Sequence, residues 1–282
     1  MTTPFDADGE IDDKALAAQV EYLLDAGVHG LAAGGSTGEG HTLGYDELRR
    51  VVATTCETAA GRVPVIAGII VDSTRDAVAR GQAVAGLGVA ALQVTPVHYL
   101  FRPDDAAMLA HFRAIAEATE LPVIIYNVVP WSYLSPDLLR TIMADVPGVV
   151  GVKQSAGDLK LLADLLARRR SGDLILSAVD ALLYPSYTLG ADGAIAAILT
   201  AAPAASVALW DAVEDGDHGR AHDLHVRLLR LWNALAADNL PANVKTALEL
   251  QGCPGGLPRA PMPSSSPAQR DAIAAALAGI DA

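Results

Sequence analysis

The feature that most constrains the fold is the alternation of short apolar runs with longer stretches of helical periodicity. Each run spans four to six residues and is almost continuously apolar, which is typical of parallel strands buried on both faces. Alternating strands and helices predict a parallel sheet with right-handed crossovers. The predicted strands are Val28–Ala33, Val63–Ala67, Ala90–Thr95, Val123–Asn127, Val149–Lys153, Leu174–Ser177 and Ala194–Ile198.

The helices between these runs have readable ends. Asp12 or Asp13 is placed to cap a helix that Gly27 ends, because a side-chain carboxylate accepts from free amides and glycine adopts the left-handed cap. Ser73, with Asp76 three residues later, resembles a capping box. Ser135 precedes Pro136, a cap followed by the proline that helices accept at their first position.

Residues 1–203 are predicted to form a (β/α)8 barrel. A closed barrel needs an eighth strand, and Thr2–Phe5 supplies its last residues if the first strand is short or truncated. The alternative is an open doubly wound sheet, which is disfavoured because no G-x-G-x-x-G follows the first strand. Residues 204–282 are predicted to be a C-terminal helical extension of the same structural unit, with helices at His218–Ala237, Pro241–Leu250 and Pro267–Ile280.

Charge and composition exclude several classes of partner. The net charge of −13 argues against nucleic acid and anionic membranes. No apolar run is long enough to span a membrane and no secretory leader is recognisable. The two cysteines, Cys56 and Cys253, are far apart, so we expect buried free thiols rather than a metal site. These observations predict a soluble protein of the reducing cytoplasm.

Two strand ends carry side chains suited to chemistry, because catalytic groups of such barrels lie at the carboxyl ends of the strands. Lys153 ends an apolar strand, where loss of water disfavours the ammonium and frees the amine as a nucleophile. A lysine that snorkels or pairs with a carboxylate is the alternative. Tyr126 ends the preceding strand and can relay protons, or can simply be an amphipathic residue of the rim.

The segment Gly34–Glu39 follows the strand Val28–Ala33. Its glycines let backbone amides approach a ligand, and Ser36 and Thr37 add hydroxyl donors, which suits a carboxylate. It is not a phosphate-binding P-loop, because no Gly-Lys-Ser/Thr follows. A simple tight turn is the alternative.

Taken together in this order, these segments resemble the dihydrodipicolinate synthase / N-acetylneuraminate lyase family. Gly35–Glu39 resembles the family's G-T/S-T-G-E loop, and Tyr126–Pro130 resembles Y-N-x-P with one extra residue. Gly151–Asp158 resembles G-x-K-[ED]-[ST]-x-G-D. The resemblance covers nearly the whole chain, with further matches at Val65–Gly68, Val94–Pro96 and Asn239–Lys245.

The resemblance implies a metal-independent lyase of the class I aldolase type, acting on pyruvate or a related 2-oxo acid without a cofactor. Lys153 would form an imine with the acid, and Tyr126 would shuttle protons. Ser36 and Thr37 would bind the substrate carboxylate, and Thr37 would link Tyr126 into a relay. Ile195 would offer a backbone carbonyl near the bound acid.

Departures from the family pattern leave the second substrate open. Members that make dihydrodipicolinate carry an arginine after Y-N-x-P, whereas this chain has Trp131–Leu134. Where the family has a tyrosine pair, this chain has Val97-His98-Tyr99, and either His98 or Tyr99 could replace the relay tyrosine. We therefore expect His98, Tyr99 and Trp131 to contact substrate, with a neutral or aromatic second half favoured unless Arg102 folds inward.

Other functions are kept as alternatives. The lysine-biosynthetic activity of the family is one, and a non-catalytic protein that binds a 2-oxo acid is another. A metal enzyme could use His218, His222 and His225, which share a predicted helix face, although a solvated face is favoured. The resemblance also implies a homodimer or homotetramer, because the relay borrows a residue from a neighbour, and Val97–Phe101 is where we place that contact.

Overall fold

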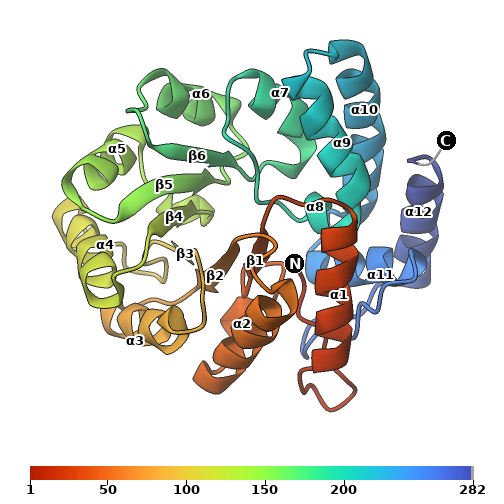
Figure 1. Cartoon of the computed structure of the whole chain (residues 1–282), viewed down its shortest axis with the longest axis horizontal. Coiled ribbons are helices and arrows are strands. Elements are labelled where there is room, and N and C mark those ends of the chain that lie inside the picture. Colours follow the sequence, from red (N-terminus) through yellow and green to blue (C-terminus); the bar gives the residue numbers. More distant parts are fainter. Residues whose placement is uncertain (281–282) are drawn as a thin grey trace.

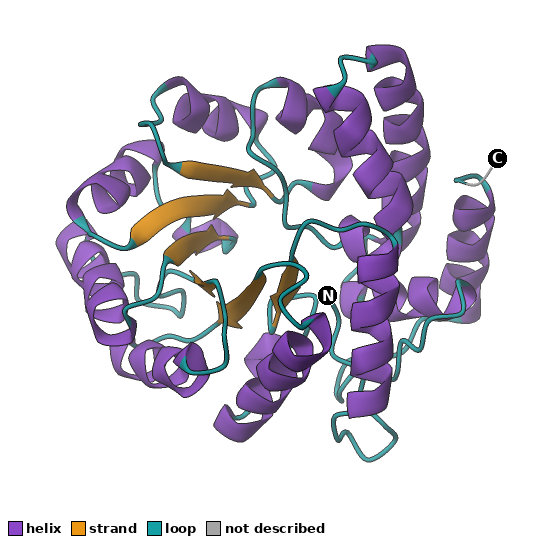
Figure 2. Ribbon diagram, in the orientation of Figure 1, coloured by secondary structure: helices purple, strands orange, loops and turns teal. Residues whose placement is uncertain are grey.

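A computed structural model describes residues 1–280. Six parallel strands form one curled sheet in sequence order, and helices surround it (Figures 1 and 2). This confirms an α/β fold built on a parallel sheet. The strands are β1 (Leu31–Ala33), β2 (Val65–Ile69), β3 (Ala91–Val94), β4 (Val123–Asn127), β5 (Val149–Gln154) and β6 (Leu174–Ser177).

The first half of the chain builds the helical layer outside this sheet. Side chains of Asp12, Ser73 and Ser135 accept hydrogen bonds from the first turns of α1, α3 and α5, as the sequence predicts. The helices of this layer are α1 (Asp13–Asp25), α2 (Tyr45–Ala59), α3 (Thr74–Ala85), α4 (Asp105–Thr119), α5 (Pro136–Asp145) and α6 (Leu159–Ala167).

The predicted seventh strand, Ala194–Ile198, is wrong. Only Ala194 pairs with the sheet, through one parallel bridge to Ser177. Ile198 instead begins the short helix α8 (Ile198–Ala201), and its amide donates to the carboxylate of Asp180 at 2.8 Å. A side chain that satisfies the first amide of a helix competes directly with strand pairing.

The predicted strand residues Thr2–Phe5 do not form a barrel strand either. Thr2 donates its amide to the Gln19 side chain, and the hydroxyl of Thr3 donates to the carbonyl of Gly38. Phe5 makes antiparallel bridges to Ile11 and Leu257. Hydrogen bonds to side chains and loops therefore take the place of strand pairing at Thr2–Phe5. Within residues 1–280, the sheet is not closed between β1 and Ala194.

After β6 the chain is helical and builds a second apolar core. The cluster around Leu183, Leu209, Leu231 and Val244 joins residues from both sides of the predicted boundary at 203/204. The division into barrel and extension therefore stays a prediction. The helices are α7 (Leu183–Thr188), α9 (Pro203–Glu214), α10 (His218–Leu235), α11 (Leu240–Leu250) and α12 (Pro267–Ala278). None of the helices within residues 1–280 is both long and apolar enough to cross a bilayer.

Candidate active site

Lys153 and Tyr126 lie side by side where β5 and β4 end. The two residues are paired in the parallel ladder, which directs both side chains to the same face of the sheet. Lys153 is 6 % exposed, and its Nζ lies 3.7 Å from the centroid of the Tyr126 ring. The structure therefore brings together the amine and the phenol that the sequence singles out.

Ser36, an exposed residue of the loop after β1, is the third member of this cluster. The hydroxyl of Tyr126 donates to Ser36 Oγ at 3.0 Å, across 90 residues of sequence. The expected link from Tyr126 to Thr37 is thus replaced by a link to the preceding residue. Thr37 follows in the same loop and is half-buried. Lys153, Tyr126 and Ser36 together present an amine, a phenol and an alcohol to one small volume.

The loop that carries Ser36 is held from the far end of the chain. Glu39, with φ of 53°, adopts the left-handed conformation that is uncommon for residues other than glycine. Its carboxylate accepts from Lys245 Nζ at 2.6 Å, and from the amide of Arg259 at 2.9 Å. The Glu39 and Lys245 side chains are 0 % and 2 % exposed, so this ion pair is fully buried and fixes the conformation of the loop.

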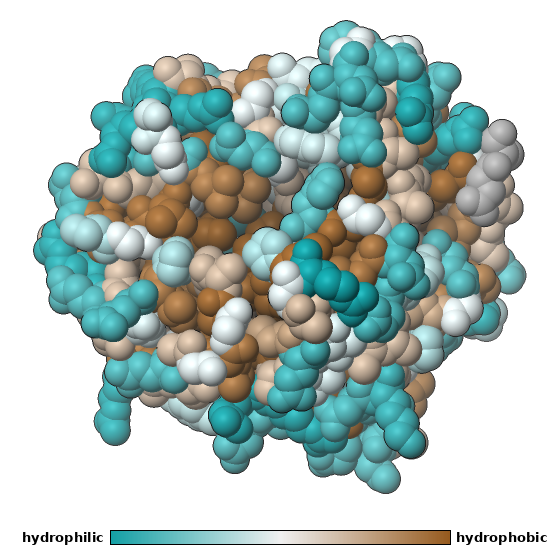
Figure 3. Space-filling model, in the orientation of Figure 1, coloured by the Kyte–Doolittle hydropathy of each residue, from teal (hydrophilic) through white to brown (hydrophobic). Residues whose placement is uncertain are grey.

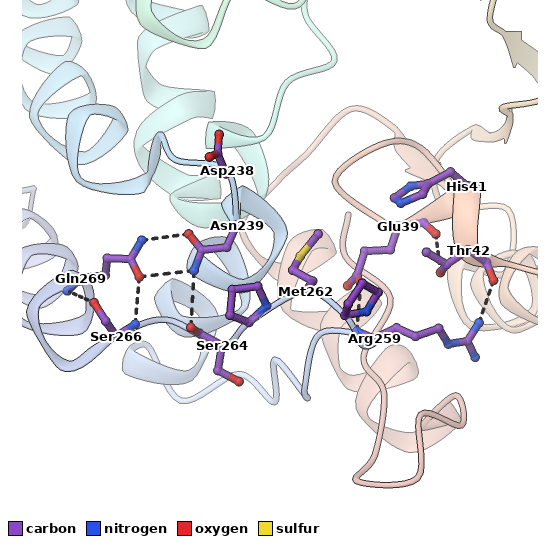
Figure 4. A pocket seen from close by; sticks show the side chains of 12 residues that line it. Glu39, His41, Thr42, Asp238, Asn239, Arg259, Met262, Ser264, Ser266 and Gln269 are labelled. Carbon is purple, nitrogen blue, oxygen red and sulfur yellow. Dashed lines mark hydrogen bonds between the residues drawn. The ribbon is translucent and has the colours of Figure 1, made fainter. Parts of the chain in front are cut away.

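Burial lowers the pKa of Lys245, while the charge of Glu39 raises it. Sequence reasoning gave the pair no role, although Glu39 and Lys245 fall inside segments that match the family. Lys245 is one of only four lysines, and that scarcity was the available clue. Figure 4 shows Glu39 and Arg259 beside a surface pocket that Met262 and Gln269 also line.

Asn127 orders the segment that follows β4. Its side chain accepts from the amide of Leu134 at 2.9 Å and donates to Gln154 Oε1 at 3.0 Å. Gln154, which stands where the family usually has an acid, therefore supports the turn after Tyr126 through a neutral hydrogen bond. Among residues 1–280, Gln154 Nε2 is buried without a hydrogen-bond partner.

Three of the expected substrate contacts, His98, Tyr99 and Trp131, lie outside this cluster, on an exposed rim made of Val97–Phe101 and Trp131. The amides of His98 and Tyr99 both donate to Asp72 Oδ1, at 3.0 and 2.9 Å. Trp131 Nε1 donates to the carbonyl of His98 at 2.7 Å. The Tyr99 and Trp131 residues are 65 % and 72 % exposed, so their rings face solvent rather than Lys153.

Tyr133 lies closer to the cluster than Trp131 does. Its hydroxyl donates to the carbonyl of Ser155, which follows β5, at 3.4 Å. Burial raises the pKa of Tyr133, and the nearby phenol of Tyr126 adds to the shift. Tyr133 is therefore the aromatic residue of this segment that borders the site.

Comparison with known proteins gives this arrangement a context. The model of the dihydrodipicolinate synthetase family matches residues 1–280. The chain belongs to this family. It is 36 % identical over 93 % of its length to a 4-hydroxy-tetrahydrodipicolinate synthase of Methanopyrus kandleri, covering 88 % of that protein. It is 37 % identical over 99 % of its length to one of Thermomicrobium roseum, covering 92 % of that protein.

Solved structures of proteins in the same family are similar to the fold of this chain. The dihydrodipicolinate synthase of Aquifex aeolicus superposes with a TM-score of 0.93 at 28 % identity, covering all of this chain and 96 % of that one. A prophage protein of the dihydrodipicolinic acid synthase family from E. coli K12, in complex with pyruvate, gives a TM-score of 0.94 at 26 % identity. That match covers 99 % of this chain and 96 % of the other.

Within this family member, Asp180 lies near Lys153, and Ile195 lies beside Ser177 at the end of β6. The amide of Ile195 donates to the carbonyl of Ser177 at 2.9 Å, which holds the segment after α7 against β6. Removal from water raises the pKa of Asp180 to about 6, against the opposing hydrogen bond from Ile198 and the charge of Lys153. Sequence reasoning missed Asp180, which lies three residues beyond the end of β6.

The three histidines of α10 do not form a metal site in the part of the chain that the structure describes. No group of three histidine, cysteine, aspartate or glutamate side chains within residues 1–280 could hold an ion. The rings of His218 and His225 instead lie 6.2 and 5.9 Å from the ring of Tyr184.

Proposed function

We propose that this protein is a Schiff-base-forming lyase that acts on pyruvate or a related 2-oxo acid through Lys153. The observation that carries the proposal is a buried amine in contact with a phenol that is itself hydrogen-bonded to Ser36. An amine in such surroundings attacks a carbonyl carbon, and loss of water then gives an imine. Family membership supports the same chemistry.

The residues around the amine of Lys153 would have separate roles in the reaction. Tyr126 would donate and accept the protons that carbinolamine formation and dehydration require. Ser36 and Thr37 would bind the carboxylate of the acid through hydroxyls and backbone amides, and Ile195 would add its carbonyl. The protonated imine then draws electrons from the adjacent carbon, which loses a proton or a bonded group and becomes an enamine.

The test is borohydride reduction in the presence of pyruvate. Reduction of the imine should add the mass of the reduced pyruvate adduct to the peptide that carries Lys153. Lys153→Arg should abolish the adduct, because a guanidinium stays protonated. Lys160→Arg is the matched control, since Lys160 is exposed on α6 and pairs with Asp164. An adduct on another lysine, or none with any small 2-oxo acid, would overturn the proposal.

For the second substrate we propose a neutral or aromatic aldehyde. The segment Trp131–Leu134 offers ring faces and hydroxyls but no fixed cation. A carboxylate placed there lacks a charge-assisted hydrogen bond of about 1.5–3 kcal/mol. Arg102 is exposed, and its guanidinium lies 3.9 Å from the carboxylate of Asp105. Aspartate semialdehyde should therefore react roughly ten- to a hundredfold less efficiently than a good partner.

A competition assay with pyruvate and a panel of aldehydes decides this point. The highest kcat/KM for aspartate semialdehyde would favour the alternative, that the chain is a 4-hydroxy-tetrahydrodipicolinate synthase like its named relatives. Arg102→Ala would then be the next variant, because Arg102 is the nearest cation after the rim segment. A protein that forms the imine but turns over no aldehyde would favour the non-catalytic alternative.

We also propose that the protein assembles as a homodimer or homotetramer through the exposed rim. Leu100 and Phe101 are 76 % and 83 % exposed, and Tyr99 and Trp131 are exposed beside them. Contiguous exposed apolar side chains of this kind mark interaction surfaces. Sedimentation at micromolar concentration tests the assembly, and a fully active monomer would overturn it.

A further inference from the structure

Gln93 is a polar side chain on the inner face of the sheet, next to the reaction centre. It lies on β3 in register with Ile124 of β4, and paired residues of parallel strands direct their side chains to the same face. Ile124 precedes Tyr126 by two residues, so these two side chains share that face as well. Gln93 therefore projects into the interior that Tyr126 and Lys153 also face, two residues nearer the amino ends along the ladder.

The surroundings of the Gln93 side chain are apolar. Ala91 and Ile124 pack in one cluster with side chains of the neighbouring strands, and Figure 3 shows hydrophobic surface in the central hollow of the molecule. Gln93 is 1 % exposed, and its Oε1 has no hydrogen-bond partner within residues 1–280. A buried amide without a partner costs free energy that an apolar side chain of the same size would avoid. Packing alone therefore does not account for a glutamine at this position.

The amide of Gln93 lies against the loop that carries Ser36. The Cβ of a side chain at Gly35 would lie 3.6 Å from Gln93 Nε2, so the amide reaches the backbone directly before Ser36. Ser36 Oγ in turn accepts from the hydroxyl of Tyr126. The polar end of Gln93 is thus positioned between the apolar interior and the loop of the reaction centre.

The same loop offers backbone donors to a ligand. Within residues 1–280, the amides of Ser36 and Thr37 donate to no acceptor. A carboxylate accepts several hydrogen bonds through its two oxygens, so two amides leave it able to accept from a further donor. The NH2 group of a glutamine supplies such a donor without adding a charge beside Lys153. A half-turn about the last bond of the Gln93 side chain exchanges Oε1 and Nε2, so the NH2 group can take the place of the unpartnered oxygen.

We propose that Gln93 is a further substrate-binding residue, whose NH2 group donates a hydrogen bond to the carboxylate of the bound 2-oxo acid from the interior side of the Ser36 loop. The inference rests on the proposed function. It adds a determinant of specificity, because a charge-assisted hydrogen bond of this kind selects 2-oxo acids over their neutral esters.

The first test measures affinity and stability in one variant. Gln93→Met replaces the amide with an unbranched apolar side chain. It should raise the pyruvate concentration that half-saturates borohydride trapping by roughly ten- to a hundredfold, the loss expected for a hydrogen bond to a charged group. Tm should stay unchanged or rise by up to about 5 °C, because an unpartnered buried amide is removed. A purely structural role predicts the reverse, a lower Tm with unchanged affinity.

The second test identifies the group that Gln93 binds. Methyl pyruvate keeps the reactive ketone but has an ester in place of the carboxylate. We compare the half-saturating concentrations of Gln93→Met and the unaltered protein as a ratio for each compound. This ratio should be roughly ten to a hundred for pyruvate and about three or less for methyl pyruvate, because a hydrogen bond to a neutral acceptor is weaker.

A third variant makes the contact depend on pH. Gln93→Glu keeps the shape of the side chain but introduces a carboxyl group. Its protonated form can donate as the amide does, whereas its ionised form repels the carboxylate of the acid. Relative to the unaltered protein, the affinity of this variant for pyruvate should fall by about tenfold per pH unit above the pKa of the new carboxyl group.

Two further variants serve as controls. Ile66→Leu alters a side chain packed against the same apolar cluster without removing an amide. Gln82→Leu removes an exposed amide of α3, which donates to the carbonyl of Ala118. Both should keep the half-saturating pyruvate concentration of the unaltered protein to within about threefold, since neither removes a hydrogen bond to the acid.

Four results would overturn the inference. They are unchanged affinity for pyruvate in Gln93→Met, equal losses for pyruvate and methyl pyruvate, an equal loss in Ile66→Leu, and no added pH dependence in Gln93→Glu. If Gln93→Met does not fold, Gln93→Leu takes its place in both comparisons. Failure of the proposed function is distinguishable, because it shows as the absence of an adduct in the unaltered protein, before any variant is compared.

Discussion

The cluster of Lys153, Tyr126 and Ser36 and the exposed rim differ in how their side chains are positioned. Lys153 and Tyr126 project from paired strand ends, and Ser36 projects from the loop after β1 and accepts a hydrogen bond from Tyr126. Tyr99 and Trp131 project from loops whose backbones are fixed while their rings face solvent. The comparison teaches that backbone pairing fixes the positions of Lys153 and Tyr126, whereas the rings of the rim are not fixed by packing within the described residues.

The largest effect should come from the cluster. Lys153→Arg should lower turnover by roughly 10⁴-fold or more, because the guanidinium cannot lose its proton to act as a nucleophile. The fold should stay intact. Steady-state kinetics with pyruvate measure the loss of turnover, and circular dichroism checks that the fold is intact. Near-normal turnover of Lys153→Arg would contradict the imine mechanism.

Tyr126→Phe should come next, with a loss of about 10²–10⁴-fold in kcat, the usual contribution of a positioned acid–base group. The ring that contacts Lys153 stays, so the rate of borohydride trapping at saturating pyruvate reports whether imine formation is the slowed step. A loss in kcat below threefold would contradict a role of Tyr126 in proton transfer and leave it only a structural role in the site.

The rim should affect assembly more than chemistry. Phe101→Asp should weaken self-association by about 30- to 1,000-fold, the range expected for a buried aromatic contact at an interface. Sedimentation across a concentration series measures this. Arg113→Asp, on the half-exposed part of α4, is a charge-changing control away from the rim. Unchanged association in Phe101→Asp would place the subunit contact elsewhere.

The smallest effect concerns pH and stability. The pKa of Asp180 rises from 3.8 to about 6 on folding, so the folded state holds this proton more tightly than the unfolded state does. The resulting stabilisation is complete below pH 3.8 and is lost as the pH rises through 6. It amounts to at most about 3 kcal/mol. Asp180→Asn should flatten the dependence of unfolding free energy on pH in this window, and an unchanged slope would contradict it.

Local pattern predicted much of the fold. β4 and β6 match their predicted bounds, and β5 extends only one residue beyond its prediction, because a strand buried on both faces must be apolar throughout. The predictions for Thr2–Phe5 and Ala194–Ile198 fail because strand formation there depends on a partner edge. The apolar run Ala194–Ile198 instead leads into a helix, because the carboxylate of Asp180 accepts a hydrogen bond from the amide of Ile198.

The site divides in the same way. Strand register brings Lys153 and Tyr126 together, and the sequence was sufficient to predict that meeting. Whether Ser36 or Thr37 reaches the phenol depends on loop geometry at the level of one residue, which no spacing rule resolves. The contact between Glu39 and Lys245 joins residues 206 positions apart, and only the folded chain reveals it.

That contact has a consequence for the order of events during synthesis. A nascent chain contains Lys153 and Tyr126 long before Lys245 leaves the ribosome, so the amine exists before the loop around Ser36 is locked. Until α11 docks, the carboxylate of Glu39 would be buried without its cation, an arrangement that proteins avoid. The loop that carries Ser36 can therefore reach its folded conformation only after α11 has docked, which makes the completion of this loop a late event in the synthesis of each molecule.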